Sequence, residues 1–256
     1  MSKLRAIEAF EDNYIWTLAD GDGQAIVVDP GDAAPVFSAI DEGLRPVAIL
    51  LTHHHPDHIG GAERLLERYP VPCYAPVESR IACATHRVVD GDAFTIPELG
   101  LRFRTIEVHG HTSSHVAFVG DDIVFCGDTL FSLGCGRMFE GTPEQMLASL
   151  DRFKTLPPET KVCCGHEYTL ANGAFASVIE PGNLALQDRL REARALREQG
   201  KPSVPSTIAS ELACNPFLRV DTPTVRSAVE QHLGAPCAER VQVFAALRRW
   251  KDGFRA

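Results

Sequence analysis

The sequence lacks a basic surface, a membrane span and a secretory signal. Its 34 acidic and 25 basic residues give a formal net charge of −9, whereas binding of phosphate backbones needs a basic footprint. No apolar run reaches the roughly 20 residues of a membrane helix, and the opening MSKLRAIEAFEDNY has no apolar signal core. We therefore expect a cytoplasmic protein with neither nucleic acid nor membrane as a partner.

The eight cysteines lack both a CxxC pair and the spacing of a disulfide framework. In a reducing compartment most of them are expected to be small buried apolar residues. The sequence thus predicts no disulfide scaffold.

The pattern of apolar residues predicts a layered α/β fold. With 256 residues, the chain is long enough for one sizeable core and a small second domain. Short apolar runs predict strands at Tyr14–Leu18, Ala25–Val28, Val47–Leu51, Leu101–Glu107, Val116–Val119, Ile123–Cys126 and Lys161–Cys164. Helices are predicted at Ala34–Glu42, Gly61–Arg68 and Pro143–Phe153.

The last third of the chain predicts a small all-α domain. Helices are expected at Leu184–Gln199, Thr224–Leu233 and Ala238–Trp250. We place the α/β domain at residues 1–170 and the helical domain at residues 171–256.

The most informative segment is THHHPDH, directly after the apolar run that ends at Leu51. His53 and His55 are two residues apart, so on extended backbone their side chains point to the same side. Pro56 keeps His55 out of the helical region and favours a helix start. Asp57 and His58 are expected in the first turn of the following helix, facing the same point. An inert, solvent-exposed histidine loop is the alternative.

Three further candidates follow apolar strands within a few residues, namely His111, Asp128 and His166. In open α/β sheets ligands bind outside the carboxyl ends of the strands, so these side chains are expected at one rim with those of THHHPDH. His109 is the rival for the position of His111, which we favour because it lies in the loop after its strand.

Seven nitrogen and oxygen ligands imply two metal ions, and a set without thiolates suits zinc, iron or manganese. His53, His55 and His111 can make one site. Asp57, His58 and His166 can make the other, with Asp128 as a bridge.

The motifs THHHPDHIGG, GHTSSH, CGDTLFSLGCGRMFEGT, CGHEYT and NPFLR resemble glyoxalase II, the hydroxyacylglutathione hydrolases of the metallo-β-lactamase superfamily. The resemblance extends over essentially the whole chain. It implies a four-layer αββα sandwich with a C-terminal helical domain. It also implies the same partition of the seven ligands between two divalent ions, with zinc favoured and iron or manganese as alternatives.

The resemblance further implies a glutathione-binding set: Arg137, Phe139, Tyr168, Arg248 and Lys251. Arg248 and Lys251 are three residues apart and so share a helix face, where solvated surface charges are the alternative. The family often has lysine and tyrosine at the positions of Arg137 and Phe139, and Phe139 lacks the tyrosine hydroxyl.

The expected reaction is hydrolysis of S-(2-hydroxyacyl)glutathione, such as S-lactoylglutathione, to glutathione and a 2-hydroxy acid such as lactate, the second step of methylglyoxal detoxification. A hydroxide shared by two metal ions would attack the thioester. The catalytic residues would be Asp128, as the bridge, and Asp57, as a ligand or a proton shuttle. We expect a monomer.

Several alternatives stay open at this point. Another hydrolase of the same fold, a lactonase or a β-lactamase, is the nearest. A mononuclear iron persulfide dioxygenase is a second. A cysteine hydrolase using Cys163 or Cys164 near His166, and a non-enzymatic metal-binding or nucleic-acid-processing module, are more distant.

Overall fold

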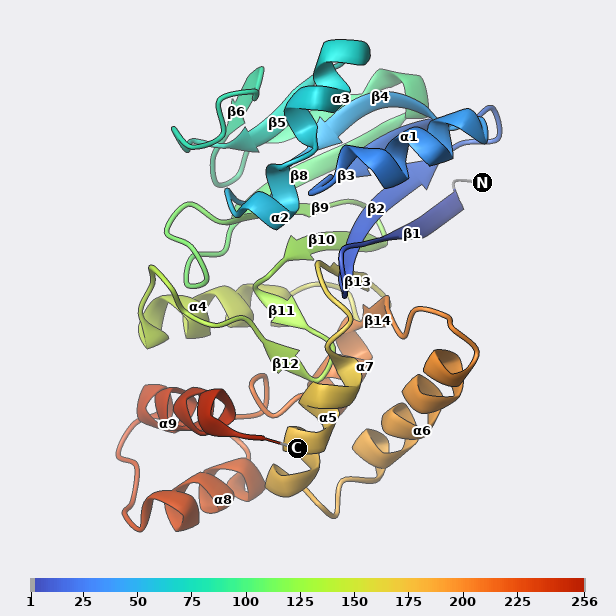
Figure 1. Cartoon of the computed structure of the whole chain (residues 1–256). Helices are drawn as coiled ribbons and strands as arrows, with labels where there is room; N and C mark the ends of the chain where they lie inside the picture. Colours follow the sequence, from blue (N-terminus) through green and yellow to red (C-terminus); the bar gives the residue numbers. More distant parts are fainter. Residues whose placement is uncertain (1–2, 256) are drawn as a thin grey trace. The chain divides into compact units, whose positions relative to one another are not determined.

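The structure is a computed structural model that describes residues 3–255 (Figure 1). Its chain divides into two compact units. The N-terminal unit extends to Glu107 and also contains Ser114–Gly127; the C-terminal unit contains Val108–Ser113 and the described chain from Asp128 onward. The domain boundary at residues 170 and 171 stays a prediction.

The N-terminal unit contains a six-stranded mixed sheet in the order β1-β2-β3-β4-β5-β6. The first three strands are antiparallel, and β3 to β6 run parallel to one another. Their bounds are β1 Lys3–Ala9, β2 Asn13–Ala19, β3 Gln24–Val28, β4 Arg45–Leu50, β5 Cys73–Pro76 and β6 His86–Val88.

Helices α1 (Ala33–Asp41) and α3 (Ala62–Arg68) pack on this sheet. Apolar side chains at helical spacing, such as Val36 and Leu65, join buried strand residues such as Ile49 in one core. Asp32 caps the start of α1, where its carboxylate accepts a hydrogen bond from the backbone N–H of Ala34.

The same unit holds a second, antiparallel run of strands in the order β10-β9-β8-β7. Their bounds are β7 Ala93–Ile96, β8 Leu101–Glu107, β9 Val116–Val119 and β10 Ile123–Gly127, and the 3-10 turn η1 covers Pro97–Leu99. The Phe94 ring stacks on Tyr74 of the first sheet at a centroid distance of 4.0 Å. Within this unit, the layer of helices α1 and α3, the six-stranded sheet and the second layer of strands are therefore stacked in that order.

The C-terminal unit is mainly helical. Two short antiparallel pairs accompany the helices: β11 (Leu130–Phe131) with β12 (Gly134–Cys135), and β13 (Lys161–Cys164) with β14 (Ser206–Thr207). The helices are α4 Pro143–Lys154, α5 Thr169–Ile179, α6 Leu184–Glu198, α7 Ile208–Cys214, α8 Pro223–Leu233 and α9 Arg240–Gly253.

A buried polar network holds the β11–β12 hairpin to helix α7 within this unit. The side-chain amide of Asn215, from NPFLR, donates to the carbonyl oxygens of Phe131 (3.2 Å) and Gly134 (2.9 Å) and to the carboxylate of Glu211. That carboxylate also accepts from the backbone N–H of Leu133 at 2.8 Å. NPFLR thus helps to shape the loop that carries GCGR.

The predicted long elements agree with the structure to within a few residues, whereas several short ones were not predicted. The unpredicted elements are β1, β5, β6, β7, η1, β11, β12, β14, α2 (Pro56–Ile59), α5 and α7. Helix α5 is apolar on most of its surface, so its sequence shows no amphipathic pattern. Among the described residues, no helix has both the length and the apolar character needed to cross a bilayer.

Candidate metal centre

The THHHPDH segment leaves β4 and enters a short helix of its own, α2 (Pro56–Ile59). Pro56 occupies the first turn and His55 is the extended N-cap residue, as the sequence predicted. The expectation that Asp57 and His58 belong to the helix at Gly61–Arg68 is wrong. A break separates α2 from α3 at Gly61, where a Cβ would lie 2.4 Å from the backbone nitrogen of Ala33.

This turn brings four of the predicted ligands together in the N-terminal unit. His53 Nε2 lies 3.2 Å from His55 Nδ1, and His58 Nε2 lies 3.6 Å from Asp57 Oδ2. The rings of His53 and His58 have centroids 4.1 Å apart. The imidazoles of His53 and His58 are buried, while His55 and Asp57 are partly exposed. The predicted same-side placement thus gives a compact nitrogen- and oxygen-rich cluster.

Asp29 is a functional candidate that the sequence analysis missed. Its buried carboxylate accepts hydrogen bonds from His58 Nδ1 (3.0 Å), the backbone N–H of Thr52 (2.8 Å) and the Thr52 hydroxyl (2.7 Å). It lies directly after strand β3, so the strand-end signal used for the other ligands would have found it. Asp29, His53 and His58 offer ligand atoms within 4.8 Å of one another.

The remaining three predicted ligands lie together in the C-terminal unit, and all three are buried. Asp128 Oδ2 lies 3.4 Å from His111 Nε2 and 3.2 Å from His166 Nε2. A carboxylate oxygen between two imidazole nitrogens is the arrangement expected of a bridging ligand. Gly136 of GCGR permits it, because a Cβ there would lie 1.9 Å from the Asp128 carbonyl oxygen.

The hydrogen bonds around the histidines fit a metal centre. His111 Nδ1 lies 2.8 Å from the carbonyl oxygen of Arg137, and His58 Nδ1 lies 3.0 Å from the Asp29 carboxylate. An imidazole that donates through Nδ1 presents the lone pair of Nε2, which is how second partners orient metal-bound histidines. Buried imidazoles and carboxylates without thiolates match the preferences of divalent zinc, iron or manganese.

Two neighbouring histidines support the N-terminal cluster. His54 faces Glu78, with Nδ1 3.7 Å from the carboxylate. His115 stacks on the ring of His53 at a centroid distance of 4.5 Å, and its Nδ1 lies 3.1 Å from the carbonyl oxygen of Val116. The stacking contact with His115 restricts rotation of the His53 ring.

The predicted aromatic substrate residues contact the ligands of the C-terminal unit. Tyr168 stacks on His166 with centroids 4.7 Å apart and an angle of 3°. Phe139 meets His111 edge-on at 5.3 Å and is 63% exposed. An exposed apolar ring beside His111 can contact a bound substrate, although it offers no hydroxyl.

The three predicted cations gather around Asp252 at the end of α9. Asp252 Oδ1 lies 3.0 Å from Arg248 Nη2 and 3.6 Å from Arg137 Nε. Burial lowers the pKa of Lys251, and the charges of Arg248 and Arg137 lower it further. The positive charge in this cluster exceeds the negative charge of Asp252, which favours binding of an anion.

The surroundings of Arg248 exclude the alternative of a solvated surface charge at this position. It is 4% exposed, donates to the Cys135 carbonyl oxygen at 2.7 Å, and lies over the Phe217 ring. These contacts link α9 to β12, so we assign Arg248 a positioning role in the cluster. Lys251 lies nearer the surface, and its ammonium donates to the carbonyl oxygen of Ala171 at 3.5 Å.

The environment of the two adjacent cysteines argues against a cysteine nucleophile. Cys163 and Cys164 are both buried. Burial raises the pKa of the Cys164 thiol to about 12, which leaves little thiolate at neutral pH.

Comparisons with known proteins show which family the chain belongs to. Residues 13–166 match the model of the metallo-beta-lactamase superfamily, and residues 167–254 match that of the hydroxyacylglutathione hydrolase C-terminus. A hydroxyacylglutathione hydrolase from Xylella fastidiosa (strain M12) is 56% identical over 253 residues, covering 98% of this chain and 97% of that protein. The chain belongs to the hydroxyacylglutathione hydrolase family.

A solved structure confirms the metallo-β-lactamase type of fold that the sequence predicted. BLEG-1 B3 metallo-beta-lactamase aligns with a TM-score of 0.63 at 24% identity, over 85% of this chain and 99% of that one. TTHA1623 in a di-iron-bound form aligns with a TM-score of 0.53 at 29% identity, over 64% and 91% respectively. The match to the hydroxyacylglutathione hydrolase C-terminus distinguishes this family member from proteins that share only the fold.

Proposed function

We propose that two divalent metal ions are held by the seven predicted ligands, His53, His55, Asp57, His58, His111, Asp128 and His166. Each unit contributes a buried or partly buried set of nitrogen and oxygen donors whose ligand atoms lie close together. The di-iron form of TTHA1623 supports two ions per chain. Zinc is favoured, with iron or manganese as alternatives.

The chain is a thioester hydrolase that converts S-(2-hydroxyacyl)glutathione to glutathione and a 2-hydroxy acid. Bound metal ions would supply a Lewis acid for the carbonyl oxygen and a source of hydroxide near pH 7. The leaving thiolate of glutathione is a stable anion, with a thiol pKa of roughly 8.5 by analogy with cysteine. The reaction therefore needs no dedicated general acid.

Side chains and one backbone carbonyl oxygen orient the ligands of this centre. The Asp29 carboxylate keeps the His58 proton on Nδ1, and the Arg137 carbonyl oxygen does the same for His111. Asn13 donates to Asp57 Oδ2 at 2.9 Å, which fixes the orientation of that partly exposed carboxylate. Asp57 is thereby positioned to act as a ligand, and its exposure also suits a proton shuttle.

We propose that the cation cluster of Arg137, Arg248 and Lys251 binds a carboxylate of the glutathione moiety. Lys251 and Arg137 would contact it directly, while Arg248 holds α9 against β12. Tyr168 and Phe139 would border the chain of the substrate, because both rings contact metal-ligand histidines in the same unit. The cytoplasmic location and the monomeric state are still predictions.

The observation that carries this proposal is the Asp128 oxygen between His111 and His166, in the unit that also contains the three cations. The test is a steady-state assay on S-lactoylglutathione beside a lactone and a β-lactam, with metal content measured on the same sample. We expect selective thioester hydrolysis with about two metal ions per chain. Preferential turnover of the lactone or the β-lactam would contradict the proposal, as would one iron per chain with oxygen uptake.

A further inference from the structure

Two cysteine thiols are neighbours in the N-terminal unit, in a region with no part in the proposed metal centre. The thiol of Cys73, at the start of β5, lies near enough to that of Cys83, in the loop that leads to β6, for each to shift the pKa of the other. Thr85 keeps the two segments together: its hydroxyl accepts from the Cys73 backbone N–H at 2.8 Å, and its own N–H donates to the Cys73 carbonyl oxygen at 3.0 Å. The two cysteines are not joined by a disulfide.

The two thiols have different environments. Cys73 is fully buried, whereas Cys83 is partly exposed. The interaction with the Cys73 thiol lowers the pKa of Cys83 to about 7, with a further contribution from the charge of Arg87 and opposition from burial and Glu63. The same interaction, together with burial, raises the pKa of Cys73. Cys83 is therefore the nucleophile of the pair at neutral pH, and Cys73 is its protonated neighbour.

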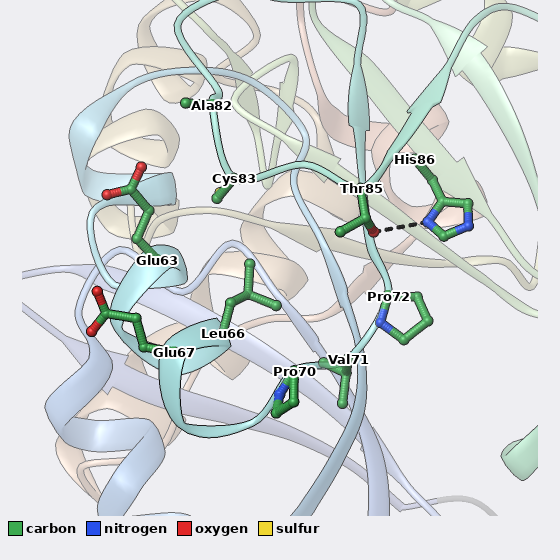
Figure 2. Close-up of a pocket in the computed structure, with 10 residues that line it drawn as sticks. All are labelled: Glu63, Leu66, Glu67, Pro70, Val71, Pro72, Ala82, Cys83, Thr85 and His86. Carbon is green, nitrogen blue, oxygen red and sulfur yellow. Dashed lines mark hydrogen bonds between the residues drawn. The ribbon is translucent and has the colours of Figure 1, made fainter.

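Cys83 lines a pocket with a volume of about 710 Å³ (Figure 2). Its apolar lining includes Leu66, Val71 and Pro72. Glu63 and Glu67, on helix α3, are exposed at the same pocket, and no lysine or arginine is among its lining residues. A small molecule that reaches Cys83 therefore meets apolar walls and two negative charges, which disfavours anions.

We propose that Cys83 is a thiol–disulfide exchange site for small neutral or cationic disulfides, and that Cys73 resolves the adduct. This inference is independent of the proposed hydrolase function. Its basis is the paired thiols, the pocket that exposes one of them, and the charge of the pocket lining.

The exchange takes place in two balanced steps. Cys83 loses its proton to water, and its thiolate attacks one sulfur of the disulfide R–S–S–R. A new bond forms between Cys83 Sγ and that sulfur, giving the mixed disulfide Cys83 Sγ–S–R, as the original S–S bond breaks and RS⁻ leaves. Cys73 then gives its proton to RS⁻ or to water, and its sulfur attacks Cys83 Sγ and releases the second RS⁻. The protein is oxidised to a Cys73–Cys83 disulfide by loss of two electrons and two protons, and the small disulfide is reduced to two thiols.

The test treats the metal-loaded full chain with cystamine, a cationic disulfide, and in parallel with glutathione disulfide, which is anionic. After an acid quench, intact mass and peptide mapping identify the products. We expect a cross-linked Cys73–Cys83 peptide that a reductant reverses, formed at least about tenfold faster with cystamine. Equal rates with the two reagents would contradict the assigned pocket. A wild-type map without this cross-link, or with other cysteines cross-linked first, would overturn the proposal.

Variants assign the two roles. Cys73→Ser should stop at a stable adduct of one cysteamine on Cys83, and Cys83→Ser should remove the reaction at this pair. Cys237→Ser is the matched control, because Cys237 lies in the C-terminal unit, and it should react like the wild type. Glu63→Gln combined with Glu67→Gln should reduce the ratio between the rate with cystamine and the rate with glutathione disulfide. Adduct formation on Cys73 in the Cys83→Ser variant, or an unchanged preference in the double glutamine variant, would refute the assignment.

Discussion

The Nδ1 atom of His58 lies 3.0 Å from the Oδ2 atom of Asp29, and both side chains are buried. Asp29 follows β3 and His58 lies in α2, so the pair joins two strand-end segments that are 29 residues apart. This hydrogen bond determines which nitrogen of His58 faces the predicted metal ligands.

Asp29→Asn should weaken metal binding by about 10–100-fold, the usual effect of losing the carboxylate partner of a metal-bound histidine. The amide keeps the volume but holds the His58 proton less strongly. Competition with a chelator, followed by metal analysis, measures the affinity. Asp121→Asn, at an exposed position in the same unit, is the control. Unchanged affinity in Asp29→Asn would show that Asp29 does not orient His58.

Asp128→Ala should abolish tight metal occupancy and lower turnover of S-lactoylglutathione by about 10²–10³-fold or more. The reason is that its carboxylate oxygen lies within 3.4 Å of both His111 Nε2 and His166 Nε2. Turnover close to that of the wild type would exclude a bridging role. Circular dichroism on the same samples separates loss of metal from loss of folding.

Gly136→Ala should lower metal content and reduce the free energy of unfolding by about 1–3 kcal/mol. Its Cβ would lie 1.9 Å from the Asp128 carbonyl oxygen and 3.2 Å from His111 Nδ1, so the backbone that carries Asp128 must move. Metal analysis and urea unfolding measure the two effects. Gly182→Ala, which meets nothing within 4 Å, should behave like the wild type. A fully loaded Gly136→Ala protein would show that the loop tolerates the shift.

Lys251→Gln should raise KM for the glutathione thioester by about fivefold and leave KM for a small neutral thioester nearly unchanged. We choose Lys251 because Arg248 is buried and its removal would also disturb the contact between α9 and β12. Lys201→Gln, at an exposed site, is the control. Equal increases for both substrates would indicate altered folding and not loss of anion binding.

Glu180→Gln should lower the free energy of unfolding by about 2 kcal/mol at pH 7. Burial alone would raise the pKa of Glu180, but hydrogen bonds from Arg219 and Thr224 reverse this and lower it. A lowered folded-state pKa adds stability above the ordinary value of 4.5, and this stability is lost as the pH falls through the folded-state value. The difference between variant and wild type should therefore shrink below pH 4.5.

Urea unfolding at pH 7 and at several lower pH values measures that difference. Glu198→Gln, in an exposed part of α6, is the matched control and should show little effect at any pH. A Glu180→Gln difference that stays constant as the pH falls would show that the ion pair with Arg219 does not supply the stability.

The sequence by itself was sufficient for features that depend on neighbouring residues. The two-residue spacing of His53 and His55 placed them on one side, and Pro56 set the extended backbone before α2, because these effects are local. Long elements such as β8 and α6 followed from apolar periodicity over many residues. Short strands and the uniformly apolar α5 did not, since too few residues, or no polar face, remained to form a pattern.

Only the tertiary structure decided which distant groups meet. The contacts of Asp29 with His58, of Asp252 with Arg137, and of Cys73 with Cys83 join segments that local sequence patterns do not relate. Burial is equally non-local: Arg248 lies on an amphipathic helix, yet its guanidinium is enclosed by β12 and Phe217. Hydrogen bonding and desolvation depend on where the whole chain places its atoms, and they set the charge and orientation of each of these groups.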